Sequence, residues 1–343
     1  MKERASNFEL LRIIAMMCIV MYHALIGHFS FTLNDNIYMA LMFPLHIGVI
    51  LFVLISGYFG IKTSPKGLLK IISYMLLYCL IIPLLAQILL GIGNFELSIS
   101  SLMFISRTEL WYMRTYLFLF LLAPIINLYL SRSDLFHRIC IIVILGFIAI
   151  YVGSVGNDPS LKEGKNIANF MLLYAIGHCL NHEQKTINNI KTQTILSVYL
   201  FINLSVVLSY IFIPTLRPKL WTLFFYYCSP GLILNSILVL ILISRIKFSS
   251  PKFNYWASSA LAIYLIHCSN IFNVYITTPF CNYLKQSTNN HVLTMAGIFA
   301  LGILTCIFCL AIDKIFTPYW SIVSKLSKYT TTQYMQLKSK FNE

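Results

Sequence analysis

The sequence predicts an all-α membrane protein, a polytopic helical bundle with about ten transmembrane helices. Of its 343 residues, 58% are hydrophobic and only 10% are charged. Soluble domains contain roughly 45–50% apolar and about 25% charged residues. At about 20 residues for each crossing, the apolar content is sufficient for about ten spans. This composition excludes a soluble enzyme, a disordered chain, a collagen and a coiled coil.

Ten apolar runs along the chain each have about the length that a helix needs to cross a bilayer. The connections between them are short and leave no room for a separate soluble domain. We therefore predict one membrane domain over residues 1–312 and a basic cytoplasmic tail over residues 313–343. In chain order, the predicted spans are Phe8–Ser30, Ile37–Phe59, Leu68–Ile92, Leu110–Leu130, Ile139–Val155, Ile167–Leu180, Gln193–Ile213, Trp221–Ile243, Tyr255–Ile276 and His291–Ile312.

The 25 lysine and arginine residues outnumber the 11 acidic residues, and their positions predict how the chain is oriented. If the connections alternate between the two sides, 17 of these cations fall on one side and six on the other, with Arg12 and Arg114 inside spans. Because cytoplasmic loops carry the excess of positive charge, both termini are predicted to be cytoplasmic, in a multi-pass protein of the plasma or inner membrane. The net charge of +14 therefore reports mainly topology and anchoring to membrane lipids. Lys62, Lys66 and Lys70, beside the inner end of the second span, could in addition hold a polyanionic cytosolic ligand.

Most of the nine cysteines lie in predicted spans, where they behave as small apolar residues. Cys306 and Cys309 have a spacing found in metal sites, but they lie in an apolar run with no second cluster. We therefore predict no metal site, no disulfide framework and no tightly bound cofactor.

The first span contains two polar side chains that are costly inside a membrane. Arg12 lies about one turn from the cytoplasmic start, and His23 lies eleven residues further, about 16 Å along a helix. Eleven residues turn through about 1100°, close to three full rotations, so one face carries both side chains. A guanidinium suits phosphate recognition and an imidazole suits proton transfer. The alternative is that Arg12 snorkels to headgroups and His23 forms a hydrogen bond to another helix.

Four segments resemble, in order, the motifs of the acyltransferase 3 family of integral membrane acyltransferases. Arg12 and His23 match its Arg-x10-His signature, and the end of the second span matches its Ser-Gly-Tyr/Phe motif. The fourth span is similar to the family's Trp-aromatic helix that ends in Pro and Asn, and the ninth to its Ile-Tyr-Leu-x-His motif. The four segments are Phe8–His23, Leu51–Phe59, Leu110–Asn127 and Ile263–His267. One departure is that lysines stand at 62, 66 and 70, where family members often have closely spaced arginines.

This resemblance implies transfer of an acyl group, most simply acetyl, from acyl-coenzyme A to a hydroxyl of a cell-envelope saccharide such as O-antigen, capsule or exopolysaccharide. Acetyl-coenzyme A would act as a donor substrate, and the acceptor could be free or lipid-linked. His23 is the predicted catalytic residue, either as a base or as a transient acyl carrier. The predicted donor-binding residues are Arg12, Ser56, Gly57 and Tyr58, although close helix packing explains Gly57 equally well.

Five further residues are predicted to bind or support the acceptor. His46 and His267 are predicted near the depth of His23, where hydrogen bonds to neighbouring helices are the alternative. Glu109, Trp111 and Arg114 are predicted at the outer end of the fourth span, as a wall for a sugar or as part of an interfacial aromatic belt.

A polytopic transporter or a flippase of lipid-linked glycan is the competing prediction, with Arg12, His23 and His267 lining a substrate path. Matching interrupted helices or similarity between the two halves would favour it, and neither is visible in the sequence. The basic tail is predicted to anchor at the membrane surface and not to bind nucleic acid.

Overall fold

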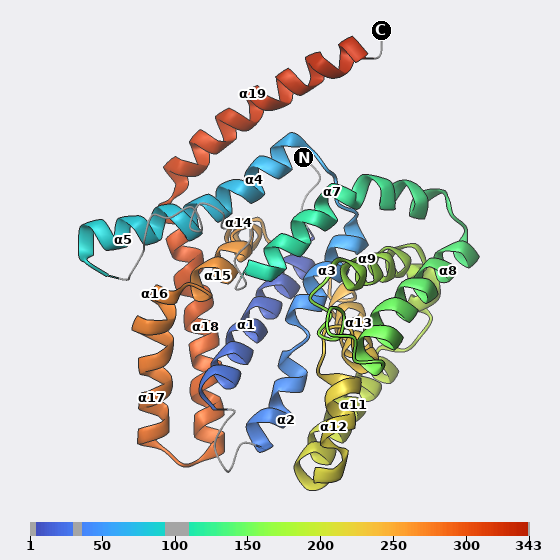
Figure 1. Ribbon diagram of the computed structural model, residues 1–343, viewed down its shortest axis with the longest axis vertical. Helices are drawn as coiled ribbons and strands as arrows, with labels where there is room; N and C mark the ends of the chain where they lie inside the picture. Colours follow the sequence, from blue (N-terminus) through green and yellow to red (C-terminus); the bar gives the residue numbers. More distant parts are fainter. Residues whose placement is uncertain (1–4, 30–35, 93–109, 342–343) are drawn as a thin grey trace.

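The computed structural model describes residues 5–29, 36–92 and 110–341, and all regular structure in these ranges is helical (Figure 1). The prediction of an all-α polytopic bundle is confirmed. In order, the helices are α1 (Ser6–His28), α2 (Asn36–Leu45), α3 (Gly48–Phe59), α4 (Pro65–Leu76), η1 (Leu77–Ile81), α5 (Ile82–Leu90), α7 (Trp111–Arg132), α8 (Leu135–Gly146), η4 (Phe147–Val155), α9 (Ile167–His182), α10 (Gln184–Asn188), α11 (Thr192–Phe212), η5 (Pro214–Leu216), α12 (Arg217–Phe224), α13 (Pro230–Ser244), α14 (Pro251–Ala257), α15 (Ala260–His267), α16 (Asn270–Phe272), η6 (Asn273–Thr277), α17 (Thr278–Ser287), α18 (His291–Ile315) and α19 (Thr317–Phe341).

The number of long spans is smaller than the predicted ten. Within the described ranges, seven helical segments are long and apolar enough to cross a membrane, or eight if the bent pair Pro251–His267 and Asn270–Ser287 counts as one span. The predicted sixth span is α9, which has only 16 residues. The predicted eighth span is divided into α12 and α13 by a break at residues 225–229, and α13 has only 15 residues. The predicted apolar segments are therefore helical, but some of them form short helices inside the bundle and not long spans.

α1 lies at the centre of the bundle and packs against α2, α3, α13, α14, α15, α17 and α18. α3 packs against α9 over an extensive contact. Glycines allow this close approach, because a side chain at Gly57 would overlap the main chain of Tyr174, and one at Gly177 would overlap the main chain of Leu54. Small residues at a helix contact are a common way to bring two membrane helices together.

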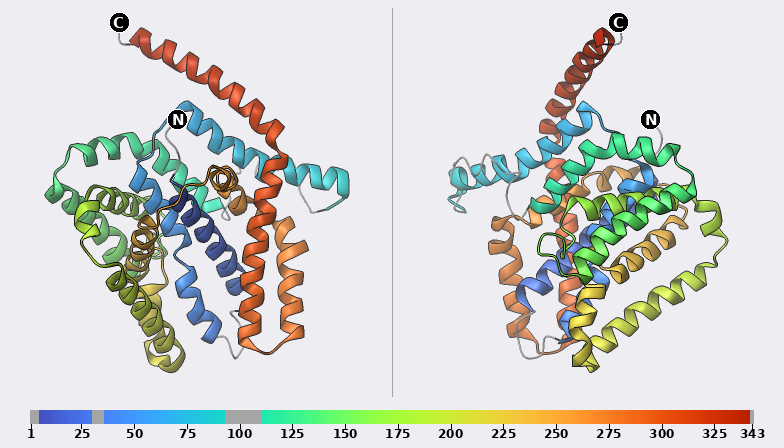
Figure 2. Two further views of the ribbon diagram at one scale, coloured as in Figure 1. Left: turned by 180° about the vertical axis from the view of Figure 1, so that it is seen from behind. Right: turned by 45° about the vertical axis from the view of Figure 1, so that its right-hand side comes forward.

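The segment α4–η1–α5 runs across the end of the bundle at which α1 begins and from which α19 projects (Figures 1 and 2). Its length and apolarity suit a span, as the sequence predicted, but it lies crosswise to α1 and α18. Four side chains attach it to the end of α18, and we call them the aspartate cluster. They are Asp313, Tyr74, Tyr78 and Trp320.

The carboxylate of the aspartate cluster is 3% exposed. Asp313 accepts hydrogen bonds from the Tyr78 hydroxyl at 2.6 Å and from the Trp320 indole N–H at 3.1 Å. The Tyr74 hydroxyl lies 3.5 Å from its other oxygen. Asp313 is the last acidic residue before α19, at the start of the predicted tail, so its burial was not predicted from the sequence.

Candidate active site

His23 and His267 lie side by side, although 244 residues separate them in the chain. Their nearest ring nitrogens, Nδ1 of His23 and Nε2 of His267, are 3.1 Å apart. Nδ1 of His267 lies 2.6 Å from the carbonyl oxygen of Ile263, one turn earlier in α15. His267 is buried, whereas His23 is partly exposed at the centre of the bundle. The central helix and the broken ninth span therefore bring together two residues that the sequence predicted at a common depth.

The thiol of Cys268 completes what we call the histidine cluster, His23, His267 and Cys268. Its sulfur lies 3.4 Å from Nε2 of His267 and 3.9 Å from Nδ1 of His23. The three potential ligand atoms lie within 4.8 Å of one another, so they could also hold a metal ion. No metal ligand was predicted here, because the spacing of these histidines and cysteines in the sequence does not match a metal-site motif.

His46 lies one ring away from the histidine cluster. Its imidazole stacks on Tyr22, with ring centroids 4.3 Å apart, and contacts Tyr227 edge-on at 4.4 Å. The residue is buried, and neither ring nitrogen has a hydrogen-bond partner in the described part of the chain. Aromatic packing therefore holds the ring, and the acceptor-binding role of His46 stays a prediction.

Arg12 lines a cavity of about 610 Å³ near the start of α1. The guanidinium is 29% exposed and forms an ion pair of 2.5 Å with Glu9, which is 3% exposed. The other polar atoms on the wall come from α3, α4, α7 and the turn before α15, in residues Ser56, Lys70, Tyr112, Tyr116 and Ser258. The cavity combines positive charge, hydroxyl groups and aromatic faces.

The three residues predicted beside Arg12 have different positions. Ser56 lines the cavity, where its hydroxyl donates to the Phe52 carbonyl and lies 3.3 Å from the Tyr116 hydroxyl. Gly57 and Tyr58 do not line this cavity, so their role as donor contacts stays a prediction. Gly57 faces α9, and the Tyr58 ring packs on Phe8 at 4.8 Å. One turn of helix carries these residues, so they point in different directions.

Two aromatic rings separate the Arg12 cavity from the histidine cluster. Tyr112, on the cavity wall, has its ring centroid 5.5 Å from that of Tyr264. The ring of Tyr264 is 6.0 Å from that of His267. The side chains of α7 and α15 thus form the partition between the two parts of the candidate site.

Trp111, one residue of the predicted acceptor wall, lies deeper than expected. Trp111 begins α7 beside Tyr227, with ring centroids 5.2 Å apart, and Tyr227 contacts His46. Trp111 is therefore near the level of His46 and not at the outer end of a span, because α7 begins inside the bundle. Arg114 is partly exposed and is absent from the Arg12 cavity wall, and Glu109 lies outside the described residues.

A different ion pair accompanies Trp111. The ammonium group of Lys165 lies 5.7 Å from the Trp111 ring and 2.6 Å from the carboxylate of Glu163. Both charged side chains are almost half exposed. The combination of carboxylate, cation and indole that the sequence predicted around Glu109 and Arg114 is thus present, but the loop 156–166 supplies its charges.

The loop 156–166 is held against the break between α12 and α13. Gly164 has a φ of +70°, and a side chain there would overlap the main chain of Tyr227 and Cys228. The side-chain amide of Asn169 donates to the carbonyls of Gly164 and Tyr227 at 3.0 and 3.2 Å. Hydrogen bonds from Ser160 lower the pKa of Asp158 in the same loop. These contacts fix the position of the loop beside Trp111.

The sequence did not point to Cys268, Glu163 or Lys165 as site residues, whereas Tyr112 and Tyr116 follow Trp111 and were predicted with it as aromatic faces of the sugar wall or of the interfacial belt. Cys268 had a usable signal, since it follows His267 directly. Glu163 and Lys165 had none, because a charged pair in a connecting loop is ordinarily solvated.

The comparison with protein families agrees with the motifs. The model of the acyltransferase 3 family, described as an acyltransferase domain, matches residues 6–314. No curated protein and no solved structure gives a match. Since the family model covers nearly the whole chain, the protein belongs to this family and is a multi-pass membrane acyltransferase.

Proposed function

We propose that this membrane acyltransferase transfers an acetyl group from acetyl-coenzyme A to a hydroxyl of a cell-envelope saccharide, with His23 as the base. The observation that carries the proposal is the hydrogen-bonded pair of His23 and His267 at the centre of the bundle.

The hydrogen-bond partners define the proton positions in this pair when both rings are neutral. The Ile263 carbonyl can only accept, so the Nδ1–H of His267 donates to it and its Nε2 carries a lone pair. The Nδ1–H of His23 then donates to that Nε2. This leaves the Nε2 of His23 without a proton, ready to accept one from a hydroxyl group.

The reaction needs two proton transfers, one from the acceptor hydroxyl to His23 and one from His23 to the leaving thiolate. The acceptor oxygen attacks the thioester carbonyl carbon while Nε2 of His23 takes the hydroxyl proton. The carbon–sulfur bond then breaks, and the leaving thiolate receives the proton from His23. The products are the acetyl ester and coenzyme A, and the protein returns to its starting state.

The donor enters, in this proposal, through the cavity beside Arg12. The guanidinium provides a planar pair of donors for a phosphate or carbonyl oxygen, and Ser56 and Tyr116 provide hydroxyls. Arg12 and His23 are eleven residues apart on α1, about 16 Å at the helical rise. In this proposal the thioester arm has to pass the partition of Tyr112 and Tyr264 to reach His23.

The acceptor approaches from the side of Trp111. An indole face with a carboxylate and an ammonium group beside it, as in Trp111, Glu163 and Lys165, suits a sugar ring with several hydroxyls. Because Trp111, Glu163 and Lys165 do not line the Arg12 cavity, donor and acceptor do not compete for one space in this proposal.

The test uses purified protein with radiolabelled acetyl-coenzyme A and an envelope glycan. The wild type is expected to transfer label to the glycan, and His23→Gln is expected not to, since its amide cannot take up a proton near neutral pH. Activity is expected to persist with EDTA. Movement of glycan across the membrane of proteoliposomes without label transfer would contradict the proposal and favour a flippase, and EDTA-sensitive transfer would reassign the histidine cluster to a metal.

A further inference from the structure

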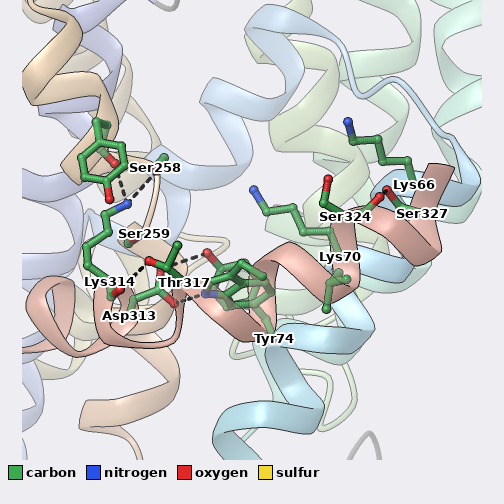
Figure 3. Close-up of a pocket in the computed structure, with 13 residues that line it drawn as sticks. Lys66, Lys70, Tyr74, Ser258, Ser259, Asp313, Lys314, Thr317, Ser324 and Ser327 are labelled. Carbon is green, nitrogen blue, oxygen red and sulfur yellow. Dashed lines mark hydrogen bonds between the residues drawn. The ribbon is translucent and has the colours of Figure 1, made fainter.

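A second cavity, of about 320 Å³, lies between α4, α14 and the junction of α18 with α19 (Figure 3). Lys66 and Lys70 of α4 line one side and are exposed, and Lys314 lies near the end of α18. The ammonium group of Lys314 donates to the Tyr255 carbonyl at 2.7 Å and lies 3.3 Å from the Ser258 hydroxyl. Lysines and hydroxyls are the side chains that bind phosphate groups.

Ser259 gives this cavity an unused polar group. It is 1% exposed, and its hydroxyl has no hydrogen-bond partner in the described part of the chain. Because a buried hydroxyl without a partner costs free energy, this arrangement favours a ligand that supplies the missing acceptor. A phosphate oxygen in the cavity would do so.

Among the described residues that line the cavity, three lysines outnumber the one acidic residue, Asp313, so the wall keeps a net positive charge. The Oδ1 oxygen of Asp313 accepts hydrogen bonds from Tyr78 and Trp320 in the aspartate cluster. Figure 3 shows Asp313 close to Tyr74, and the ammonium groups of Lys66 and Lys70 on another part of the wall. Aromatic faces of Tyr74, Tyr255 and Trp320 complete the lining.

The second cavity continues into the Arg12 cavity, because Lys70 and Ser258 line both. A single ligand can therefore extend from the lysines of α4 past Arg12. We propose that the second cavity binds the phosphorylated nucleotide head of the acyl donor, with the thioester arm in the Arg12 cavity. Aromatic side chains on the wall offer stacking faces for the base. This inference rests on acyl-coenzyme A being the donor, as in the proposed function.

The test measures binding of radiolabelled adenosine 3′,5′-bisphosphate, which has the nucleotide but no thioester arm, to purified protein in phosphatidylcholine nanodiscs. The double variant Lys66→Ala/Lys70→Ala is expected to weaken binding at least about ten-fold, as for the loss of charge-assisted hydrogen bonds. Lys62→Ala is the matched control, since Lys62 is an exposed lysine just before α4 that does not line the cavity, and it should bind as the wild type does.

Ser259→Ala provides a second variant that changes no charge. It is expected to bind the bisphosphate several-fold more weakly and to remain as stable as the wild type, because it removes a hydroxyl that has no partner. Equal affinity in the wild type and in the double lysine variant would overturn the proposal. The protein is also reconstituted in phosphatidylglycerol nanodiscs. If this lipid displaces the bisphosphate, and the lysines are required only for binding the lipid, the cavity is a site for a lipid headgroup and the proposal is overturned.

His23→Gln separates this inference from the proposed function. The variant is expected to bind the bisphosphate normally, since His23 lines neither cavity. Normal label transfer by His23→Gln would refute the catalytic proposal and leave the nucleotide site intact. Absence of bisphosphate binding in a wild-type protein that transfers label would refute the nucleotide site alone.

Discussion

The histidine cluster and the aspartate cluster are both polar groups enclosed by apolar helices, but they differ in how fully they are hydrogen-bonded. In the aspartate cluster, Asp313 is buried and its carboxylate accepts from two donors. In the histidine cluster, His23 is partly exposed, and the hydrogen-bond geometry leaves one of its ring nitrogens without a proton. A satisfied buried network holds helices together, whereas an incompletely satisfied one is available for chemistry. The comparison predicts that the first cluster controls stability and the second controls turnover.

The largest expected effect is on catalysis, at His23. His23→Ala should lower turnover by about 100-fold to 10,000-fold, the range for loss of a positioned base. Its unfolding temperature in detergent should stay near that of the wild type, because one imidazole contributes little to the bundle. Steady-state kinetics and a thermal melt check this prediction. A fall in unfolding temperature as large as that of an Asp313 variant would contradict the difference between the two clusters.

The next largest effect is on stability, at Asp313. Asp313→Leu leaves the Tyr78 hydroxyl and the Trp320 N–H without their acceptor, so the free energy of unfolding should fall by about 2–3 kcal/mol. Thermal or denaturant unfolding measures this loss. The control is Asp134→Asn, at an exposed helix N-cap where asparagine serves equally well, and it should remain near wild-type stability.

Arg12 should affect donor use and not the chemical step. Arg12→Ala is expected to raise the apparent KM for acetyl-coenzyme A by about ten-fold, because it removes a charge-assisted contact in the cavity. Arg12→Lys should recover part of this loss, since the planar fork is absent. Initial rates with donor and acceptor varied separately decide the point, and a change in acceptor KM alone would mean that the role is assigned wrongly.

His267 is expected to act through His23 as a positioning residue. His267→Ala removes the acceptor for the Nδ1–H of His23, so turnover should fall by about ten-fold and its pH profile should change. His267→Gln keeps an oxygen that can accept this hydrogen bond and should recover part of the rate. Equal rates and equal pH profiles in all three proteins would show that the histidine pair is structural.

The smallest effect is expected at His46, whose ring is held by aromatic packing. His46→Phe keeps a ring against Tyr22 and Tyr227 and removes two buried nitrogens without partners. Stability should be unchanged or slightly higher, and turnover should stay within about two-fold of the wild type. A large fall in acceptor affinity would instead give His46 the acceptor-binding role that the sequence suggested.

The sequence by itself determined the class of the protein. Composition and apolar runs indicate a membrane helical bundle, since a bilayer requires long apolar helices whatever their neighbours. The motifs identified the family, and the helical repeat predicted that Arg12 and His23 share a face, because both residues belong to one helix. Each of these properties depends on residues close together in the chain.

Only the tertiary structure decided which distant residues meet. It joined His267 to His23, placed Glu163 and Lys165 beside Trp111, and turned Gly57 toward α9. These outcomes depend on where spans break, such as at residues 225–229 and between α15 and α16, and on where α7 begins. Apolar content is the same whether a helix crosses the bilayer, stops inside the bundle or lies across its end, so the sequence pattern does not distinguish these packings.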